Sequence, residues 1–257
     1  MDRSAAENAR QLALFDELPA EGAAPVHHLV LAGRSIEYRF GRRRRRTIGI
    51  RIDATGLAVS APWRTPWREI DAFLRASERW IVARLDEWAS VARPARFHGT
   101  NGEVLPLFGE KLTLEVLAGR RAVTLQGPRL LLRHPAPLRH GAVREQLLQW
   151  LKARALEALV PRAAHYAARL DLPPPPVAIS NARTQWGVCM ESGRVRLSWR
   201  LVHLEPALAD YVVAHETAHL VELNHSKRFW KLVEALYPDW RAARKAIELA
   251  GAALPII

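Results

Sequence analysis

Three histidines and one glutamate have the spacing expected of the ligands and general base of a zinc hydrolase. His215, Glu216 and His219 form the pattern H-E-x-x-H, and His225 follows six residues later. On an α-helix, residues four positions apart lie on the same face. Both imidazoles can therefore reach one Zn²⁺ at about 2.0–2.1 Å. Glu216 lies one step round the helix, where its carboxylate can reach a water on the metal without being a ligand.

A catalytic zinc site has three protein ligands and one open position, and His225 is the natural third ligand. We predict a helix over residues 206–223 that ends at Asn224, because asparagine tolerates the left-handed conformation that closes many helices. The end of this helix would turn His225 back toward the metal. Glu222 is the alternative third ligand. The competing interpretation, a pair of ordinary histidines on an amphipathic helix, leaves His225 unexplained.

The same residues resemble a known family. The pattern H-E-x-x-H-L-x-x-x-N-H-S-x-x-F-W, from His215 to Trp230, is similar to the active-site signature of the YgjP-like metallopeptidases, which are relatives of the SprT-like zincins. A second block, in segments 183–189 and 195–201, resembles the Trp-Gly-x-Cys strand and the strand after it that precede the metal helix in that family. The resemblance extends from about residue 30 to residue 250.

This resemblance implies an α+β fold whose zincin-like catalytic domain combines helices with a small antiparallel sheet. It places Trp186 and Gly187 near a substrate cleft, because a strand beside the metal helix of zincins pairs with extended substrate. Trp186 as a core residue remains the alternative. Two positions depart from the family pattern: Ser198 stands in place of asparagine, and Thr217 in place of a larger apolar residue. Both concern substrate detail rather than the metal.

The expected function is that of a zinc metalloendopeptidase acting on protein or peptide substrates. Glu216 would take a proton from a metal-activated water and deliver it to the leaving amine. A further donor should stabilise the oxyanion, and four residues remain open for that role: His203, Tyr211, Tyr166 and Arg183.

Composition bears on where the chain works. No apolar run reaches the roughly 18–20 residues of a membrane helix, so we expect no membrane partner. The N-terminal segment lacks a signal-peptide pattern because acidic residues interrupt it. The single cysteine, Cys189, excludes an internal disulfide and fits a reducing compartment, where it is best interpreted as a small packing residue. We therefore predict a cytoplasmic protein.

The net charge of +12, from 38 Lys and Arg against 26 Asp and Glu, indicates DNA as a further partner. The five-arginine run would contact phosphates: Arg42, Arg43, Arg44, Arg45 and Arg46. The alternative is a solvated loop in an arginine-rich composition. Two rival functions follow: a DNA-associated, SprT-like protease, or a non-enzymatic nucleic-acid-binding protein with structural zinc. Structural zinc sites normally have four ligands, rich in cysteine, which disfavours the second rival.

The predicted organisation has three parts: a tail at 1–25, a β-rich domain with one helix at 26–137, and the zincin-like domain at 138–257. Alternating apolar residues predict hairpins in the β-rich part, and helical spacing predicts its helix over 66–90. The proline-rich segment near 137 marks the boundary. In the zincin-like part we predict a helix over 142–170 that is kinked or divided at Pro161. No internal repeat is evident.

Overall fold

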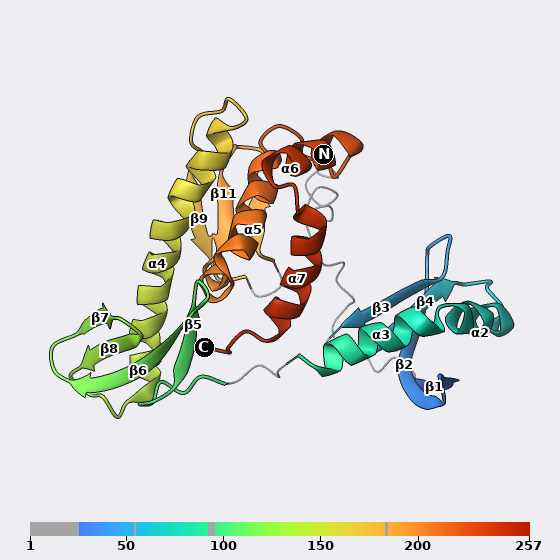
Figure 1. Ribbon diagram of the computed structural model, residues 1–257, viewed down its shortest axis with the longest axis horizontal. Helices are drawn as coiled ribbons and strands as arrows, with labels where there is room; N and C mark the ends of the chain where they lie inside the picture. The colour runs from blue at the N-terminus through green and yellow to red at the C-terminus, as the bar shows by residue number, and fades with distance from the viewer. Residues whose placement is uncertain (1–25, 54, 92–95, 183–184) are drawn as a thin grey trace, which may run out of the picture. The chain divides into compact units, whose positions relative to one another are not determined.

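A computed structural model describes residues 26–53, 55–91, 96–182 and 185–257. They form two compact units, one before residue 92 and one after residue 95 (Figure 1). The predicted tail at 1–25 lies outside the described residues. The division falls well before the boundary predicted near residue 137. The reason is that the strands between 104 and 134 bury their apolar side chains in the same core as the helices that follow them.

The first unit is a four-stranded sheet with helices packed on it. The sheet order is β1-β2-β4-β3, with β2 and β4 parallel and both outer pairs antiparallel. Apolar residues alternate along the strands and, with two helices, close one core. The strands are β1 Val26–Leu31, β2 Arg34–Arg43, β3 Gly49–Asp53 and β4 Gly56–Pro62.

Two helices occupy the segment where the sequence predicted one. They are α2 Trp67–Ala76 and α3 Glu78–Ala89, separated at Ser77, whose ψ of 5° departs from the helical value. Serine is a weak helix former because its hydroxyl competes for backbone hydrogen bonds. The break lets Ile70 of α2 and Ile81 of α3 reach the same core.

The second unit begins with another four-stranded sheet, packed against a long helix. Its order is β5-β6-β8-β7, again with a parallel central pair. The helix, α4 His140–Ala168, continues through Pro161, whose exposed ring lies on its solvent side. Of the two predicted effects of this proline, a kink or a division, the division is therefore wrong. The strands are β5 Val104–Leu107, β6 Glu110–Ala118, β7 Ala122–Gln126 and β8 Arg129–His134.

These two sheets repeat one another in strand order and in register. In the central parallel pairs, Tyr38 lies beside Leu57 and Leu114 beside Leu130. Each first hairpin turns through two residues with positive φ, which are Ala32 and Gly33 in one copy and Phe108 and Gly109 in the other. The following helix begins 11 residues after the start of β4 in one copy and 11 residues after the start of β8 in the other, from Gly56 to Trp67 and from Arg129 to His140. The chain therefore contains a duplicated ββββα module.

The sequence analysis missed this duplication because identical residues are few. The matching pattern is Leu-x-Leu-x-Gly at Leu29–Gly33 and again at Leu105–Gly109, followed by alternating apolar residues. Such spacing is common to many hairpins. Only the paired registers show that the two segments are equivalent along their whole length.

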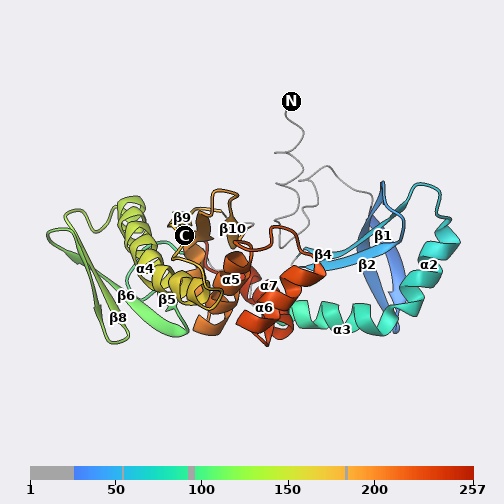
Figure 2. The same cartoon turned by 90° about the horizontal axis from the view of Figure 1, so that it is seen from above.

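The remaining elements surround one central helix, α5 Pro206–Ala218. It lies among α4, α6 and α7 (Figures 1 and 2), and every residue from Tyr211 to Ala218 is buried. A helix buried on all sides is apolar all round, and α5 fits this description apart from the polar side chains that it carries. Its neighbours are a three-stranded sheet of order β10-β11-β9, the short helix η1 Trp199–His203, α6 Lys227–Leu236 and α7 Trp240–Ala252. The strands of that sheet are β9 Val177–Ser180, β10 Gly187–Cys189 and β11 Val195–Ser198.

The architecture is the α+β arrangement that the family resemblance implied, but the small sheet beside α5 is mixed rather than antiparallel, because β9 and β11 run parallel. Among the described residues, none of the helices is both long and apolar enough to span a membrane. One helix end differs from expectation: α5 stops at Ala218 with His219 as its C-cap, a turn earlier than the predicted end at Asn224.

Core packing in the second module can be tested on one strand, β6. Leu114 is fully buried, so we expect Leu114→Ala to lower the free energy of unfolding by about 2–5 kcal/mol through lost burial and a cavity. The matched change Leu117→Ala, at a side chain that is 37% exposed, should cost about 0.5 kcal/mol or less. Urea unfolding of the full chain, followed by circular dichroism, measures both. Equal costs would contradict the placement of this strand.

Candidate metal centre

The buried end of α5 carries the H-E-x-x-H residues into the core of the second unit. His215 and Glu216 lie in the last turn of the helix and His219 is its C-cap residue, and each of the three is 2% exposed or less. Helical spacing stacks the two histidines one turn apart, with ring centroids 5.1 Å from each other. The sequence prediction that these side chains face inward is therefore confirmed.

His225 joins these two histidines from outside the helix. One nitrogen of each imidazole lies within 4.8 Å of the others, and this trio is a possible metal-ligand group among the described residues. The Nε2 atoms of His215 and His225 are 3.1 Å apart. Two nitrogens bound to one tetrahedral zinc lie about 3.3 Å apart, given Zn–N bonds of about 2.0–2.1 Å. The spacing of His215 and His225 therefore suits two ligands of one metal ion such as zinc, and His219 offers a third nitrogen within 4.8 Å of both.

The electrostatics of the cluster favour neutral imidazoles, which is the form that binds metal. Burial, reinforced by the neighbouring histidines, holds the pKa of His215 well below its usual value. Burial also lowers the pKa of His219 to about 4, against the opposing effect of its hydrogen bond to the Glu222 carbonyl. Within the described residues, His219 Nε2 is buried without a hydrogen-bond partner. A bound cation would give that nitrogen the partner it lacks.

The short turn after α5 fixes the positions of the ligands His219 and His225. His219 Nδ1 lies 3.0 Å from the backbone oxygen of Glu222, an arrangement that fixes the ring and points Nε2 at the cluster. Ser226 then caps α6 by accepting a hydrogen bond from the Phe229 N–H. This cap sets the direction of the chain immediately after His225. Glu222 itself contributes its backbone rather than its carboxylate, which lies 4.0 Å from Arg228.

Two aromatic side chains of α6 pack against the imidazoles. Phe229 stacks on His219 with ring centroids 4.3 Å apart, and Trp230 stacks on His225 at 5.6 Å. Trp230 in turn stacks on Trp240 of α7 at 4.2 Å. These rings limit the rotamers of the ligands. The sequence signature contained Phe229 and Trp230, but their contact with the histidines became evident only in three dimensions.

Glu216 is buried between α5 and β10. Burial raises the pKa of its carboxyl to about 8, although a hydrogen bond from the Cys189 backbone N–H acts in the opposite direction. Its Oε2 atom has no hydrogen-bond partner within the described residues. The carboxyl is thus held at one oxygen and unsatisfied at the other, as suits a group that moves protons.

Gly187 allows this close approach. A Cβ atom at this position would lie 2.4 Å from Cγ of Glu216, so any side chain would displace the glutamate. The sequence had associated Gly187 with substrate. The structure shows a further reason for glycine there, namely the room that it leaves for Glu216.

The neighbouring Trp186 is 8% exposed and belongs to the core of the second unit. Its indole packs against Gly251 of α7, where an added Cβ would lie 2.7 Å from the ring. This packing favours the interpretation of Trp186 as a core residue. β10 itself is an edge strand, and a small hollow beside it is lined by Ser180, Ala182, Gln185, Gly187, Val188 and Arg196.

The four candidate oxyanion donors fall in different places. Tyr211 lies one turn before His215 on α5, with ring centroids 6.0 Å apart, and within the described residues its buried hydroxyl has no hydrogen-bond partner. His203 has its Nδ1 2.7 Å from the Pro106 carbonyl. Tyr166 is buried on α4 beside His165. Arg183 lies outside the described residues. Of the described candidates, Tyr211 is the one in ring contact with a ligand histidine.

The arginine run lies in the first unit, on the end of β2 and the loop after it. Arg42 is half-buried and donates to the backbone carbonyls of Pro62 and Thr65. Arg43 to Arg46 are exposed. Whether these residues bind nucleic acid stays a prediction, and their surroundings are described below.

Comparison with known proteins identifies the family. The model of the YgjP-like metallopeptidase domain matches residues 46–249. The chain belongs to this family. Searches of curated proteins and of solved structures give no match. The family resemblance predicted from the signature is therefore confirmed, and this YgjP-like chain is a metallopeptidase-family protein with a histidine trio able to hold a metal.

The ligand assignment predicts the effect of removing one histidine. His225→Ala leaves two of the three ring nitrogens. Zinc affinity should fall by at least about 10–100-fold, because loss of a residue that only hydrogen-bonds to a metal ligand already has an effect of that size. Zinc content after dialysis and competition with a chromophoric chelator measure the change. The control is His165→Ala, at an exposed histidine on α4. Unchanged zinc affinity in His225→Ala would move the third ligand elsewhere.

Gly187 allows a second test. We expect Gly187→Ala to displace the Glu216 side chain and to reduce peptide hydrolysis by at least about tenfold, because misplacement of a catalytic group by about 1 Å can cost 100-fold. Zinc content should remain at the wild-type value. Gly141→Ala is the control, since a Cβ there meets no atom within 4 Å. Full activity of Gly187→Ala would show that the contact with Glu216 is unimportant.

Proposed function

We propose that this YgjP-like chain is a zinc-dependent endopeptidase of the H-E-x-x-H type. One observation carries the proposal: three imidazole nitrogens converge at the end of α5, and the adjacent residue, Glu216, buries its carboxyl beside an edge strand. His215, His219 and His225 would hold the ion. When bound, zinc supplies a Lewis acid that polarises a peptide carbonyl and makes a coordinated water more acidic.

Glu216 is the proposed general base and acid. Its position one residue after His215 places the carboxyl next to the ligand cluster but outside it. The hydrogen bond from the Cys189 N–H holds one oxygen, which leaves the other to accept a proton from water and to return it to the leaving amine. Burial keeps bulk water away from this transfer and limits competing proton acceptors.

The edge of β10 is the proposed substrate site. In the antiparallel ladder, the backbone groups of Trp186 and Val188 point toward β11. The backbone groups of Gly187, between them, therefore point away from β11, toward the open edge of the sheet. An extended peptide could add to this edge as a further strand. Trp186 would support the site by packing against α7, and the hollow beside Val188 would receive a side chain of the peptide.

Among the rival functions, the structural-zinc protein has the weaker support. The metal-ligand group found in the described residues has three members rather than four, and a position left open is typical of catalysis. The DNA-associated protease differs from the main proposal in its substrates rather than in its chemistry. The cytoplasmic location predicted from the sequence stays a prediction.

The proposal is tested at Glu216. We expect Glu216→Gln to keep zinc and to lose at least about 100-fold in cleavage of an unfolded protein such as casein, because an amide cannot take the proton. The matched control is Glu222→Gln, which alters a carboxyl paired with Arg228 and leaves the backbone bond to His219 in place. Wild-type turnover by Glu216→Gln would exclude Glu216 as the base. Loss of zinc in Glu222→Gln would instead implicate that carboxylate as a ligand.

A further inference from the structure

One end of the sheet in the first unit carries exposed tryptophan and arginine side chains at the border of its core, where Trp67 packs with its ring centre 4.4 Å from that of the buried Phe40. Here β2 and β4 end side by side, with Arg43 paired to Pro62. Trp63 follows β4 and is 71% exposed, and Trp67 begins α2 and is 48% exposed. We refer to this area as the Trp–Arg surface, made of Arg43, Arg44, Arg46, Trp63, Arg64 and Trp67.

Arg42 holds this surface in shape. Its guanidinium donates to the Pro62 carbonyl at 2.8 Å and to the Thr65 carbonyl at 2.5 Å, which closes the turn that carries Trp63. It also lies 5.5 Å from the centre of the Trp67 ring. Arg42 therefore holds the turn that carries Trp63 and lies over the ring of Trp67, while its predicted contact with phosphate stays a prediction.

The duplicated module shows that the fold does not require these residues. In the second copy, the same β-strand registers and the same spacing to the helix place small or polar residues at the positions of Arg42, Arg43, Trp63 and Trp67, whereas the loop after β6 keeps two arginines, Arg120 and Arg121. Ala118 and Gly119 correspond to Arg42 and Arg43, Ala136 to Trp63, and His140 to Trp67. The second copy builds its sheet and helix without the two tryptophans, so binding is a better explanation of these exposed rings than the stability of the fold.

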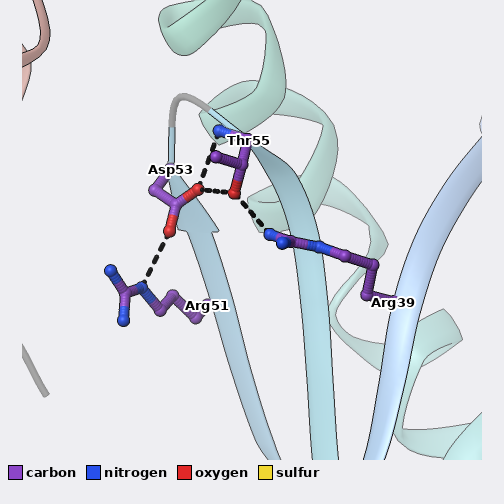
Figure 3. A network of polar contacts seen from close by, with 4 residues as sticks. All are labelled: Arg39, Arg51, Asp53 and Thr55. Atoms are coloured by element: carbon purple, nitrogen blue, oxygen red, sulfur yellow. Dashed lines mark hydrogen bonds and ion pairs between the residues drawn. The ribbon is translucent and has the colours of Figure 1, made fainter. Parts of the chain in front are cut away.

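Several other arginines of the first unit are committed to internal contacts. Arg51 pairs with Asp53 at 2.9 Å, and Arg39 donates to the Thr55 hydroxyl, which is itself bonded to Asp53 (Figure 3). By contrast, the arginines of the Trp–Arg surface are exposed and have no carboxylate partner among the described residues. Between residues 26 and 91 the chain has 13 arginines and seven acidic residues. The surface is therefore positively charged and lacks an internal counter-charge.

We propose that the Trp–Arg surface binds single-stranded nucleic acid. Trp63 and Trp67 would stack on unpaired bases, which present flat faces to aromatic rings regardless of sequence. Arg43, Arg44, Arg46 and Arg64 would neutralise the phosphates along the strand. Exposed aromatic rings among cations suit single strands better than duplexes, because the bases of a duplex are already stacked on one another. This binding is independent of the metal centre and of peptide hydrolysis.

The stacking part of the proposal is tested at Trp63, the more exposed tryptophan. Fluorescence anisotropy of a labelled 20-nucleotide oligo-dT with the full chain should show binding that Trp63→Ala weakens about 5- to 100-fold. Trp63→Phe should retain most of the affinity, since a ring remains. The control is Trp80→Ala, which removes a 53% exposed tryptophan from α3 of the same unit. Equal affinities of Trp63→Ala and Trp80→Ala would overturn the proposal.

The charge part is tested by the salt dependence of the same binding. Replacing Arg43, Arg44 and Arg46 together by serine should reduce the slope of log affinity against log salt by about 2, given about 0.7 per phosphate on a single strand. The control replaces Arg34, Arg75 and Arg79, of which Arg34 and Arg75 are paired with Asp86 and Asp71. This control replacement should reduce the slope less than the replacement of Arg43, Arg44 and Arg46 does.

Two other results would exclude nucleic acid as the ligand. One is Trp63-dependent binding to phosphatidylserine vesicles without binding to oligo-dT, which would assign the surface to a membrane. The other is Trp63-dependent self-association in sedimentation, again without oligo-dT binding, which would assign it to a second copy of the chain. Circular dichroism of each variant checks that the fold is intact.

Discussion

The second unit depends on the burial of α5 together with its ionisable side chains. Removing imidazoles and a carboxyl from water disfavours their charged forms, and here it lowers the pKa of His215 and His219 and raises that of Glu216 to about 8. Neutral imidazoles are metal ligands, whereas an isolated buried carboxylate is costly. A divalent cation reverses this balance, because its own charge becomes the largest in the site. The buried histidines and glutamate of this unit therefore form a site that suits a bound cation.

This burial also explains why backbone groups position the site. The Glu222 carbonyl orients His219, the Cys189 N–H holds Glu216, and the absence of a side chain at Gly187 lets the helix approach β10. Backbone partners satisfy buried polar groups without adding further side chains to a crowded core. Stacking on Phe229 and Trp230 further restricts the rotamers of His219 and His225. The geometry of the metal centre thus follows from core packing and from backbone hydrogen bonds rather than from a network of polar side chains.

The sequence predicted what depends on side-chain type and local spacing. H-E-x-x-H on a helix brings His215 and His219 together whatever surrounds them, and Ser226 caps α6 as serine commonly caps helices. It did not predict what depends on distant partners. The early end of α5 follows from the contact between His219 and Glu222, and the continuity of α4 through Pro161 is possible because that ring faces solvent. The unit boundary depended on which core the strands between 104 and 134 join, a choice that alternation alone leaves open.

The two copies of the duplicated module differ in what they pack against. In the second copy the first hairpin turn carries Phe108, whose N–H donates to the Val202 carbonyl at 2.5 Å and whose ring lies 5.4 Å from the Arg162 guanidinium. That copy is thereby built into the catalytic unit. The first copy has Ala32 at the equivalent place, with no ring to make such a contact, and a Cβ at Gly33 would meet no atom within 4 Å. Since the first copy has its own core and does not need the catalytic helices for burial, its surface residues are free to be selected for binding.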